Sequence, residues 1–215
     1  DVYTGGVDAY STLGWFDDSL LSTVVDRSDY QLAGLVFHEL AHQVAFAAGD
    51  TSFNESFATA VEREGIRRWS ESLNDKRLLD GAELSLSRQS DFVALVTLWR
   101  SRFHELYESK LPNAEKRNRK QALQSGLRAA YQLLKKSWQG YGGYDAWFAR
   151  ELNNAQLSTV ASYNDWVSAF DVLLDQEKGD LRSFYRRVAE LAEQEEPVRK
   201  EALRQLNSLS VEATL

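Results

Sequence analysis

Two histidines and a glutamate stand at a spacing that suits metal chemistry, in the stretch FHELAHQ of residues 37–43. Successive residues of an α-helix turn by about 100°, so His38 and His42 face the same side and both imidazoles can reach one metal ion. Glu39 is offset by about 100° from His38, where its carboxylate can reach a water molecule on the ion. The spacing therefore predicts two metal ligands and a general base for hydrolysis.

A third ligand is expected, because a catalytic zinc ion usually has three protein ligands and one open position. Glu55, in NESFA, is the main candidate, since it lies in the first turn of a second predicted helix, where the helix dipole favours an anion. Asp50, in the preceding turn, is a weaker candidate. The remaining histidine, His104, is interpreted as a surface or packing residue. The predicted cofactor is Zn2+, which lowers the pKa of a bound water molecule to about 7.

Glu62 follows Glu55 by two helical turns and lies close to the same face. From there its carboxylate can hydrogen-bond a ligating histidine and fix the imidazole tautomer. The alternative for Glu62 is a salt bridge to Arg63, to Arg67 or to a neighbouring helix. The alternative for the two histidines is a place in the core, hydrogen-bonded to neighbouring groups.

Two helices are expected to carry these side chains, at about residues 31–48 and 54–70. Both have residues at their predicted starts whose side chains commonly accept a hydrogen bond from a helix N-terminus. These residues are Ser28 and Asp29 for the first helix, and Ser52 and Asn54 for the second.

The predicted fold class is α+β, predominantly helical. Residues 1–16 combine paired glycines with aromatic and β-branched residues, which predicts a strand or hairpin and hence a small N-terminal sheet. Residues 88–110 and 114–138 are long amphipathic stretches, and Pro112 between them marks a turn. These two stretches predict an antiparallel helical hairpin.

A single catalytic domain of residues 1–215 is expected, because the chain has only 2 prolines and no linker rich in serine or glycine. Residues 1–84 would hold an edge strand and the zinc-binding helices, and residues 85–215 would form a helical half that closes the cleft. The sequence has no methionine and opens on DVYTGG, so an N-terminal portion is expected to be missing.

The composition argues against several classes of function. Lys and Arg number 25 against 32 Asp and Glu, and this net charge of −7 argues against nucleic acid as a partner. The absence of cysteine excludes thiolate metal sites and cysteine nucleophiles. The sequence has no apolar run long enough to span a bilayer and no signal peptide. Membrane contact is therefore expected only through a missing N-terminal anchor.

The motif HELAHQ followed by NESFATAVE is distantly similar to the gluzincin metallopeptidases aminopeptidase N and thermolysin. The spacer of 12 residues between the second histidine and the ligand glutamate is shorter here than in aminopeptidase N. A second resemblance, to a family of bacterial aminopeptidases, covers most of the chain. It rests on YTGGVDAYSTLGWFDDSLL at 3–21, FHELAHQ at 37–43, FNESFATAVE at 53–62 and LNNAQL…Y at 152–163.

These resemblances imply a zincin-like fold and zinc-dependent hydrolysis of a peptide substrate. They also imply a location in the bacterial cell envelope, periplasmic or lipid-anchored. In gluzincins an edge strand upstream of the metal helix binds the substrate backbone, which assigns that role to Ala9, Tyr10 and Ser11.

The C-terminal half of a gluzincin usually supplies a hydrogen-bond donor for the oxyanion formed during hydrolysis. Tyr163 is the candidate that the resemblance favours, and Tyr141 and Tyr144 are alternatives. Asn153 and Asn154 would bind substrate backbone or cap the helix that follows them.

An aminopeptidase also needs a carboxylate that binds the free amine of its substrate, and the chain lacks the GAMEN-like motif that supplies it in aminopeptidase N. Asp8, Asp17 and Asp18 stay open as candidates. Aminopeptidase activity is the main prediction. The alternatives are an endopeptidase and a non-catalytic protein-interaction module on a zincin scaffold.

Overall fold

A computed structural model describes residues 22, 24, 27–162 and 164–212. Every regular element among them is a helix, and they include no strand. The prediction of an α+β fold with an N-terminal sheet is therefore wrong, and the described part of the chain is all-α. The strand was predicted on residues 1–16, which lie outside the described residues. That prediction relied on β-propensity, which depends strongly on context.

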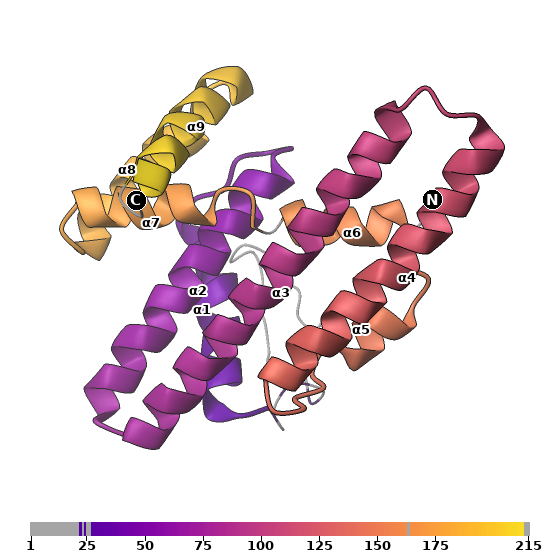
Figure 1. Cartoon of the computed structure of the whole chain (residues 1–215). Coiled ribbons are helices and arrows are strands. Elements are labelled where there is room, and N and C mark those ends of the chain that lie inside the picture. Colours follow the sequence, from indigo (N-terminus) through magenta and orange to yellow (C-terminus); the bar gives the residue numbers. More distant parts are fainter. Residues whose placement is uncertain (1–21, 23, 25–26, 163, 213–215) are drawn as a thin grey trace. The chain divides into compact units, whose positions relative to one another are not determined.

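Nine helices follow one another along the described residues (Figure 1). They are α1 (Asp29–Val44), α2 (Thr51–Leu73), α3 (Lys76–Glu108), α4 (Asn113–Ser137), α5 (Asp145–Ala149), α6 (Asn154–Ser162), α7 (Val167–Gln176), α8 (Leu181–Ala192) and α9 (Glu196–Glu212). Within the described part of the chain, none of them is both long and apolar enough to cross a membrane.

The residues group into two compact units. One unit contains residues 85–161, and the other contains the described residues up to 84 and from 162 onward. Helix α3 begins in the second of these units and ends in the first. Helices α7, α8 and α9 therefore belong with α1 and α2, whereas the sequence had suggested one helical half over 85–215. The single catalytic domain of 1–215 stays a prediction.

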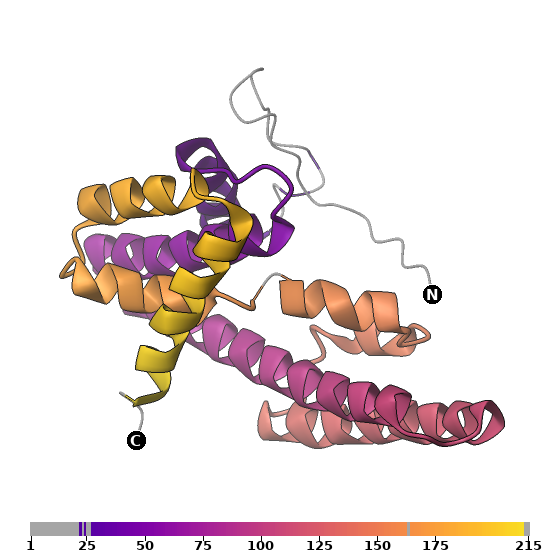
Figure 2. The same cartoon turned by 90° about the horizontal axis from the view of Figure 1, so that it is seen from above.

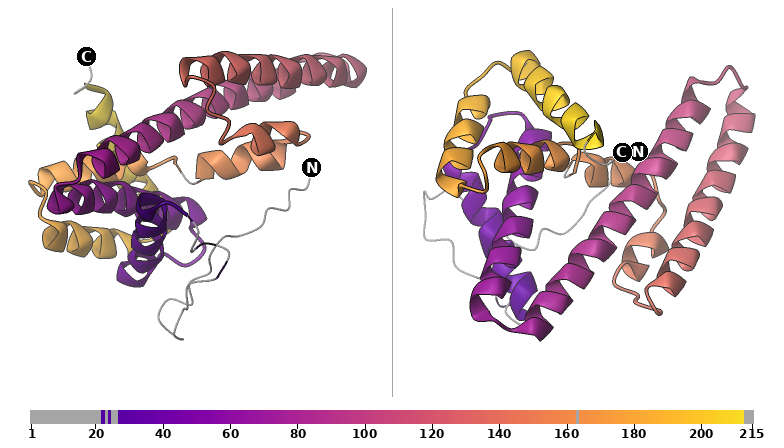
Figure 3. Two further views of the ribbon diagram at one scale, coloured as in Figure 1. Left: turned by 90° about the horizontal axis from the view of Figure 1, so that it is seen from below. Right: turned by 60° about the vertical axis from the view of Figure 1, so that its left-hand side comes forward.

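The unit of residues 85–161 is built on the predicted helical hairpin, which is confirmed. Helices α3 and α4 are joined by a short connection that ends at Pro112, the residue directly before α4 (Figures 1 and 3). The shared core explains the pairing, because side chains from both helices belong to one buried cluster. Phe92, Val96 and Phe103 come from α3, and Leu127 and Tyr131 come from α4.

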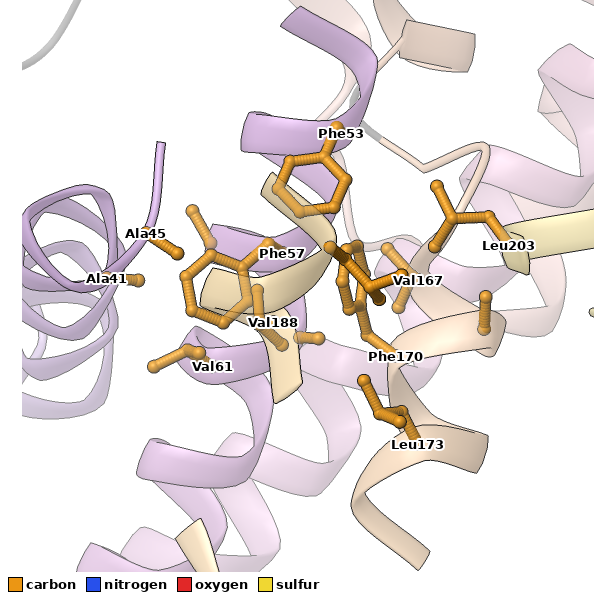
Figure 4. Packing of buried hydrophobic residues seen from close by; sticks show 14 of the residues in the cluster. Ala41, Ala45, Phe53, Phe57, Val61, Val167, Phe170, Leu173, Val188 and Leu203 are labelled. Atoms are coloured by element: carbon orange, nitrogen blue, oxygen red, sulfur yellow. The ribbon is translucent and has the colours of Figure 1, made fainter. Parts of the chain in front are cut away.

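The other unit packs α1 and α2 against α7, α8 and α9 (Figure 2). At its centre, the rings of Phe53 and Phe57 on α2 meet the ring of Phe170 on α7, with centroids 5.3 and 5.6 Å apart (Figure 4). Val188 of α8 and Leu203 of α9 are fully buried in the same cluster. The helix that carries Glu55 is thus supported by the C-terminal helices.

The turn between α1 and α2 differs from its prediction. Helix α1 begins directly after Ser28, one of its two predicted caps and slightly earlier than the predicted start near residue 31. It ends earlier than predicted because Ala45 is extended, with φ −150° and ψ 135°. Helix α2 begins earlier than predicted, because Asp50 accepts the hydrogen bond that caps it. The predicted caps, Ser52 and Asn54, lie inside the helix.

Candidate metal centre

Two glycines let α1 and α2 approach closely as antiparallel neighbours. A Cβ atom at Gly65 of α2 would lie 2.6 Å from the ring of Phe37 on α1. A Cβ atom at Gly34 of α1 would lie 2.9 Å from Ile66 on α2. The distance at Gly65 is incompatible with normal packing against the inner atoms of a ring, whereas the atom near Gly34 is the end of the Ile66 side chain, which can shift. The resulting close approach lets side chains from both helices meet.

A buried asparagine fixes the turn between the two helices. Asn54 accepts a hydrogen bond from the backbone N–H of Ala47 at 2.8 Å and donates one to the carbonyl oxygen of Ala47 at 2.9 Å. Asn54 and Ala47 are almost completely buried, so these two bonds satisfy groups that water does not reach. They hold the start of α2 in a defined position relative to the end of α1.

Three candidate ligands converge on the facing sides of α1 and α2. Glu55 Oε2 lies 3.2 Å from His38 Nε2 and 3.9 Å from His42 Nε2. One ligand atom from each of these residues lies within 4.8 Å of the others, an arrangement that can hold a metal ion. All three side chains are mostly buried, with exposed fractions of 14%, 10% and 19% for His38, His42 and Glu55. The sequence had predicted this group of three.

The second ring nitrogen of His38 contacts the fourth predicted residue, Glu62. His38 Nδ1 lies 3.3 Å from Glu62 Oε2. The alternative partner Arg67 pairs instead with Glu64 and Glu71. Glu62 is therefore placed where its carboxylate can accept a hydrogen bond from the Nδ1–H group of His38, which leaves the lone pair on Nε2 for a metal.

The two histidines differ in their electrostatic surroundings. Burial lowers the pKa of His38, but hydrogen bonds and charge interactions with Glu55 and Glu62 outweigh it and raise this pKa to about 9. Burial and the neighbouring charge of His38 lower the pKa of His42. Without a metal, His38 is therefore protonated at neutral pH, and its two ring nitrogens contact the carboxylates of Glu55 and Glu62. His42 is neutral under the same conditions.

Glu39, the predicted general base, lies on α1 directly after His38 and is partly buried. It is not part of the three-residue ligand group. Its role as general base stays a prediction.

The other predicted site residues fall elsewhere. Ala9, Tyr10, Ser11 and Tyr163 lie outside the described residues, as do Asp8, Asp17 and Asp18. The two predicted asparagines belong to the unit of residues 85–161. Asn153 accepts a hydrogen bond from the backbone N–H of Gln156 at the start of α6, and Asn154 accepts one from Tyr107. Asn153 thus caps the helix, and the substrate contacts of both residues stay predictions.

The alternative oxyanion donors also make packing contacts within that unit. The ring of Tyr144 stacks on Phe92 with centroids 4.1 Å apart, and burial raises the pKa of Tyr144 to about 12. The guanidinium of Arg88 lies 4.0 Å from the centre of the Tyr141 ring.

The sequence did not predict the role of Asp50 or any role for Arg199. The Asp50 carboxylate caps α2 and pairs with Arg199, so it is already engaged and is a poor metal ligand. The preference of aspartate for helix N-caps could have identified Asp50. No local signal pointed to Arg199, because it is 149 residues away in sequence.

A family model described as "Putative aminopeptidase" matches residues 1–203. The chain belongs to this aminopeptidase family. The match spans most of the chain, and the description of the aminopeptidase family suggests peptidase activity. No curated protein and no solved structure matches the chain.

Proposed function

We propose that the chain is a zinc-dependent aminopeptidase whose metal ion is bound by His38, His42 and Glu55. The observation that carries this proposal is the convergence of their three ligand atoms to within 4.8 Å of one another. The order of the residues along the chain supports a gluzincin-type ligand set of two histidines and a glutamate. Membership of the aminopeptidase family supports the peptide substrate.

The chemistry of the donor set fits zinc. Zinc binds imidazole nitrogen and carboxylate oxygen at about 2.0–2.2 Å, which places neighbouring ligand atoms of a tetrahedral site about 3.3 Å apart. The separations of 3.2 Å and 3.9 Å from Glu55 Oε2 to the two Nε2 atoms are close to that value. Three protein ligands would leave the fourth position open, as catalytic sites require.

The residues of the chain then have distinct tasks. A bound zinc ion would polarise the scissile carbonyl group of the substrate and lower the pKa of a bound water molecule. Glu39 takes the proton of the attacking water and passes it to the leaving amine. Glu62 would accept a hydrogen bond from the Nδ1–H group of His38 and so favour the tautomer whose Nε2 lone pair can bind a metal.

Metal content and hydrolysis together test the proposal. The purified chain should hold about one zinc ion per molecule, and Glu39→Gln should keep the zinc but lose peptide hydrolysis. Glu55→Gln should lose both, because it removes a ligand. A wild-type chain without measurable zinc affinity would overturn the proposal.

Digestion of a peptide library separates exopeptidase from endopeptidase action. An aminopeptidase releases single residues from the N-terminus, and acetylation of that terminus should abolish cleavage because the free amine is lost. Cleavage at internal bonds of acetylated peptides would replace aminopeptidase with endopeptidase while keeping the zinc chemistry.

A further inference from the structure

A buried ion pair joins the last helix to the start of the helix that carries Glu55. Arg199 of α9 donates from Nε to Asp50 Oδ2 at 3.0 Å, and its Nη2 lies 2.9 Å from the same oxygen. The two side chains are 5% and 4% exposed. Asp50 also caps α2, because its Oδ1 accepts a hydrogen bond from the backbone N–H of Phe53 at 3.1 Å. The arginine thus holds the carboxylate at which the ligand-bearing helix begins.

Arg199 is itself held on its other side. Its Nη1 donates to the carbonyl oxygens of Ala192 and Gln194, at 3.3 and 2.7 Å, where α8 ends. Its guanidinium carbon lies 5.3 Å from the centre of the fully buried Phe53 ring. A guanidinium has a rigid, planar set of donors, so it can bind a carboxylate and backbone carbonyls at once. The start of α2 is thereby fixed to the end of α8.

The position of Asp50 matters for Glu55, which follows on the same helix little more than one turn later. A helix is rigid over that length, so a shift at its cap moves the Glu55 carboxylate relative to the histidines on α1. We propose that Arg199 is a positioning residue of the metal centre, which by holding Asp50 places Glu55 against His38 and His42. This inference rests on the proposed metal-binding function.

A purely structural role for the ion pair makes a different prediction. Removal of one partner of a buried pair destabilises a fold, because it leaves a buried charge uncompensated. A structural role predicts only this loss of stability, with an unchanged metal site in the molecules that stay folded. A positioning role predicts weaker and altered metal binding in folded molecules.

The test uses the full chain and three variants. Arg199→Met removes the guanidinium. The double variant Asp50→Ser with Arg199→Met removes both charges and keeps a good N-cap, so that no buried charge is left unpaired. The matched control is Leu203→Ala, also in α9, which opens a cavity in the same core without touching Asp50. Each is measured under conditions where circular dichroism shows a folded chain.

Two readouts report on the site without use of activity. Zinc affinity is measured by competition with a chromophoric chelator, and ligand geometry by the visible spectrum of the Co2+-substituted protein. We expect zinc affinity to fall at least about tenfold in the double variant, with an altered Co2+ spectrum, because loss of groups that orient ligands typically costs about 10–100-fold. Arg199→Met should show the same changes if it folds. Leu203→Ala should unfold more easily but keep the wild-type affinity and spectrum.

Wild-type affinity and spectrum in the double variant would overturn the inference and leave the proposed function intact. Equal losses in the double variant and in Leu203→Ala would also overturn it, since general destabilisation would then explain both. If the wild-type chain bound no zinc, the proposed function would fall, and this inference with it.

Discussion

His38 Nδ1 lies 3.3 Å from Glu62 Oε2, on the opposite side of the ring from the nitrogen that faces Glu55. The imidazole is therefore held between two carboxylates from the same helix. One of them is a proposed metal ligand, and the other can orient the ring and tune its basicity.

Glu62→Gln should weaken zinc binding by about 10–100-fold, because a neutral amide polarises the imidazole less than a carboxylate does. Chelator competition measures this change. Glu71→Gln is the matched control, since Glu71 is exposed on the same helix and pairs with Arg67 rather than with a histidine. Equal zinc affinity in the two variants would contradict the role given to Glu62.

Zinc binding should release a proton at neutral pH. The pKa of about 9 means that His38 is protonated in the metal-free chain, and a ligating imidazole must lose that proton. The apparent zinc affinity should therefore rise by up to about tenfold per pH unit until pH exceeds this pKa. Calorimetry in buffers of different ionisation heat measures the released proton. An affinity that stays flat from pH 7 to 9 would contradict the release of a proton from His38 on zinc binding.

The same group should make the metal-free chain less stable at alkaline pH. The pKa of His38 is raised above the ordinary histidine value of 6.5, so the stabilising effect of its protonated ring is complete below pH 6.5 and is lost as pH rises through about 9. Urea unfolding at pH 7 and pH 10, in the presence of a chelator, measures the difference. His38→Gln should lack this contribution. If it loses as much stability over the same range as the wild type, other groups are responsible.

Gly65→Ala should destabilise the fold by about 1–3 kcal/mol, because the added methyl group overlaps the Phe37 ring. It should also weaken zinc binding, since α1 and α2 must move apart. Gly81→Ala is the matched control within a helix. Its new Cβ would meet Tyr30 at an ordinary 3.8 Å, so it should be neutral or stabilising. Thermal unfolding compares the two, and similar melting temperatures would contradict the close approach at Gly65.

Asn54→Ala should cost about 1–3 kcal/mol, because it leaves the buried N–H group of Ala47 without its partner, while the carbonyl oxygen of Ala47 keeps the hydrogen bond from the backbone N–H of Asp50. Zinc affinity should fall together with stability, since the turn between α1 and α2 loses the hydrogen bonds of Asn54 that align the two helices. Thr51→Ala, exposed on the same turn, should change either quantity little. Urea unfolding and chelator competition measure both. A stable Asn54→Ala chain with full affinity would show that this turn does not align the site.

The residues of the candidate metal centre could be brought together from the sequence because they lie on two consecutive helices. Helical periodicity alone brings His38 and His42 to one face, and Glu55 and Glu62 to one face of the next helix. A short turn between the helices then makes those faces meet. Helical periodicity and the presence of a short turn were therefore enough to predict how α1 and α2 bring these side chains together.

Other features depend on contacts that periodicity does not encode. The partnership of Asp50 with Arg199 joins residues far apart in sequence, and the packing of α7 to α9 beside α2 depends on which apolar faces meet. The start of α2 was placed too late because Asn54, a good capping residue, is used to close the turn instead. The predicted sheet followed from composition and from resemblance, and the described residues contain none.

The turn closed by Asn54 also has a consequence for the order of folding. Closing a short loop costs little chain entropy, and contacts between residues close in sequence form quickly. The hairpin of α1 and α2 can therefore assemble with its ligands already facing one another before the distant α9 reaches it. Arg199 would then bind Asp50 late in folding, after His38, His42 and Glu55 have already come close to one another.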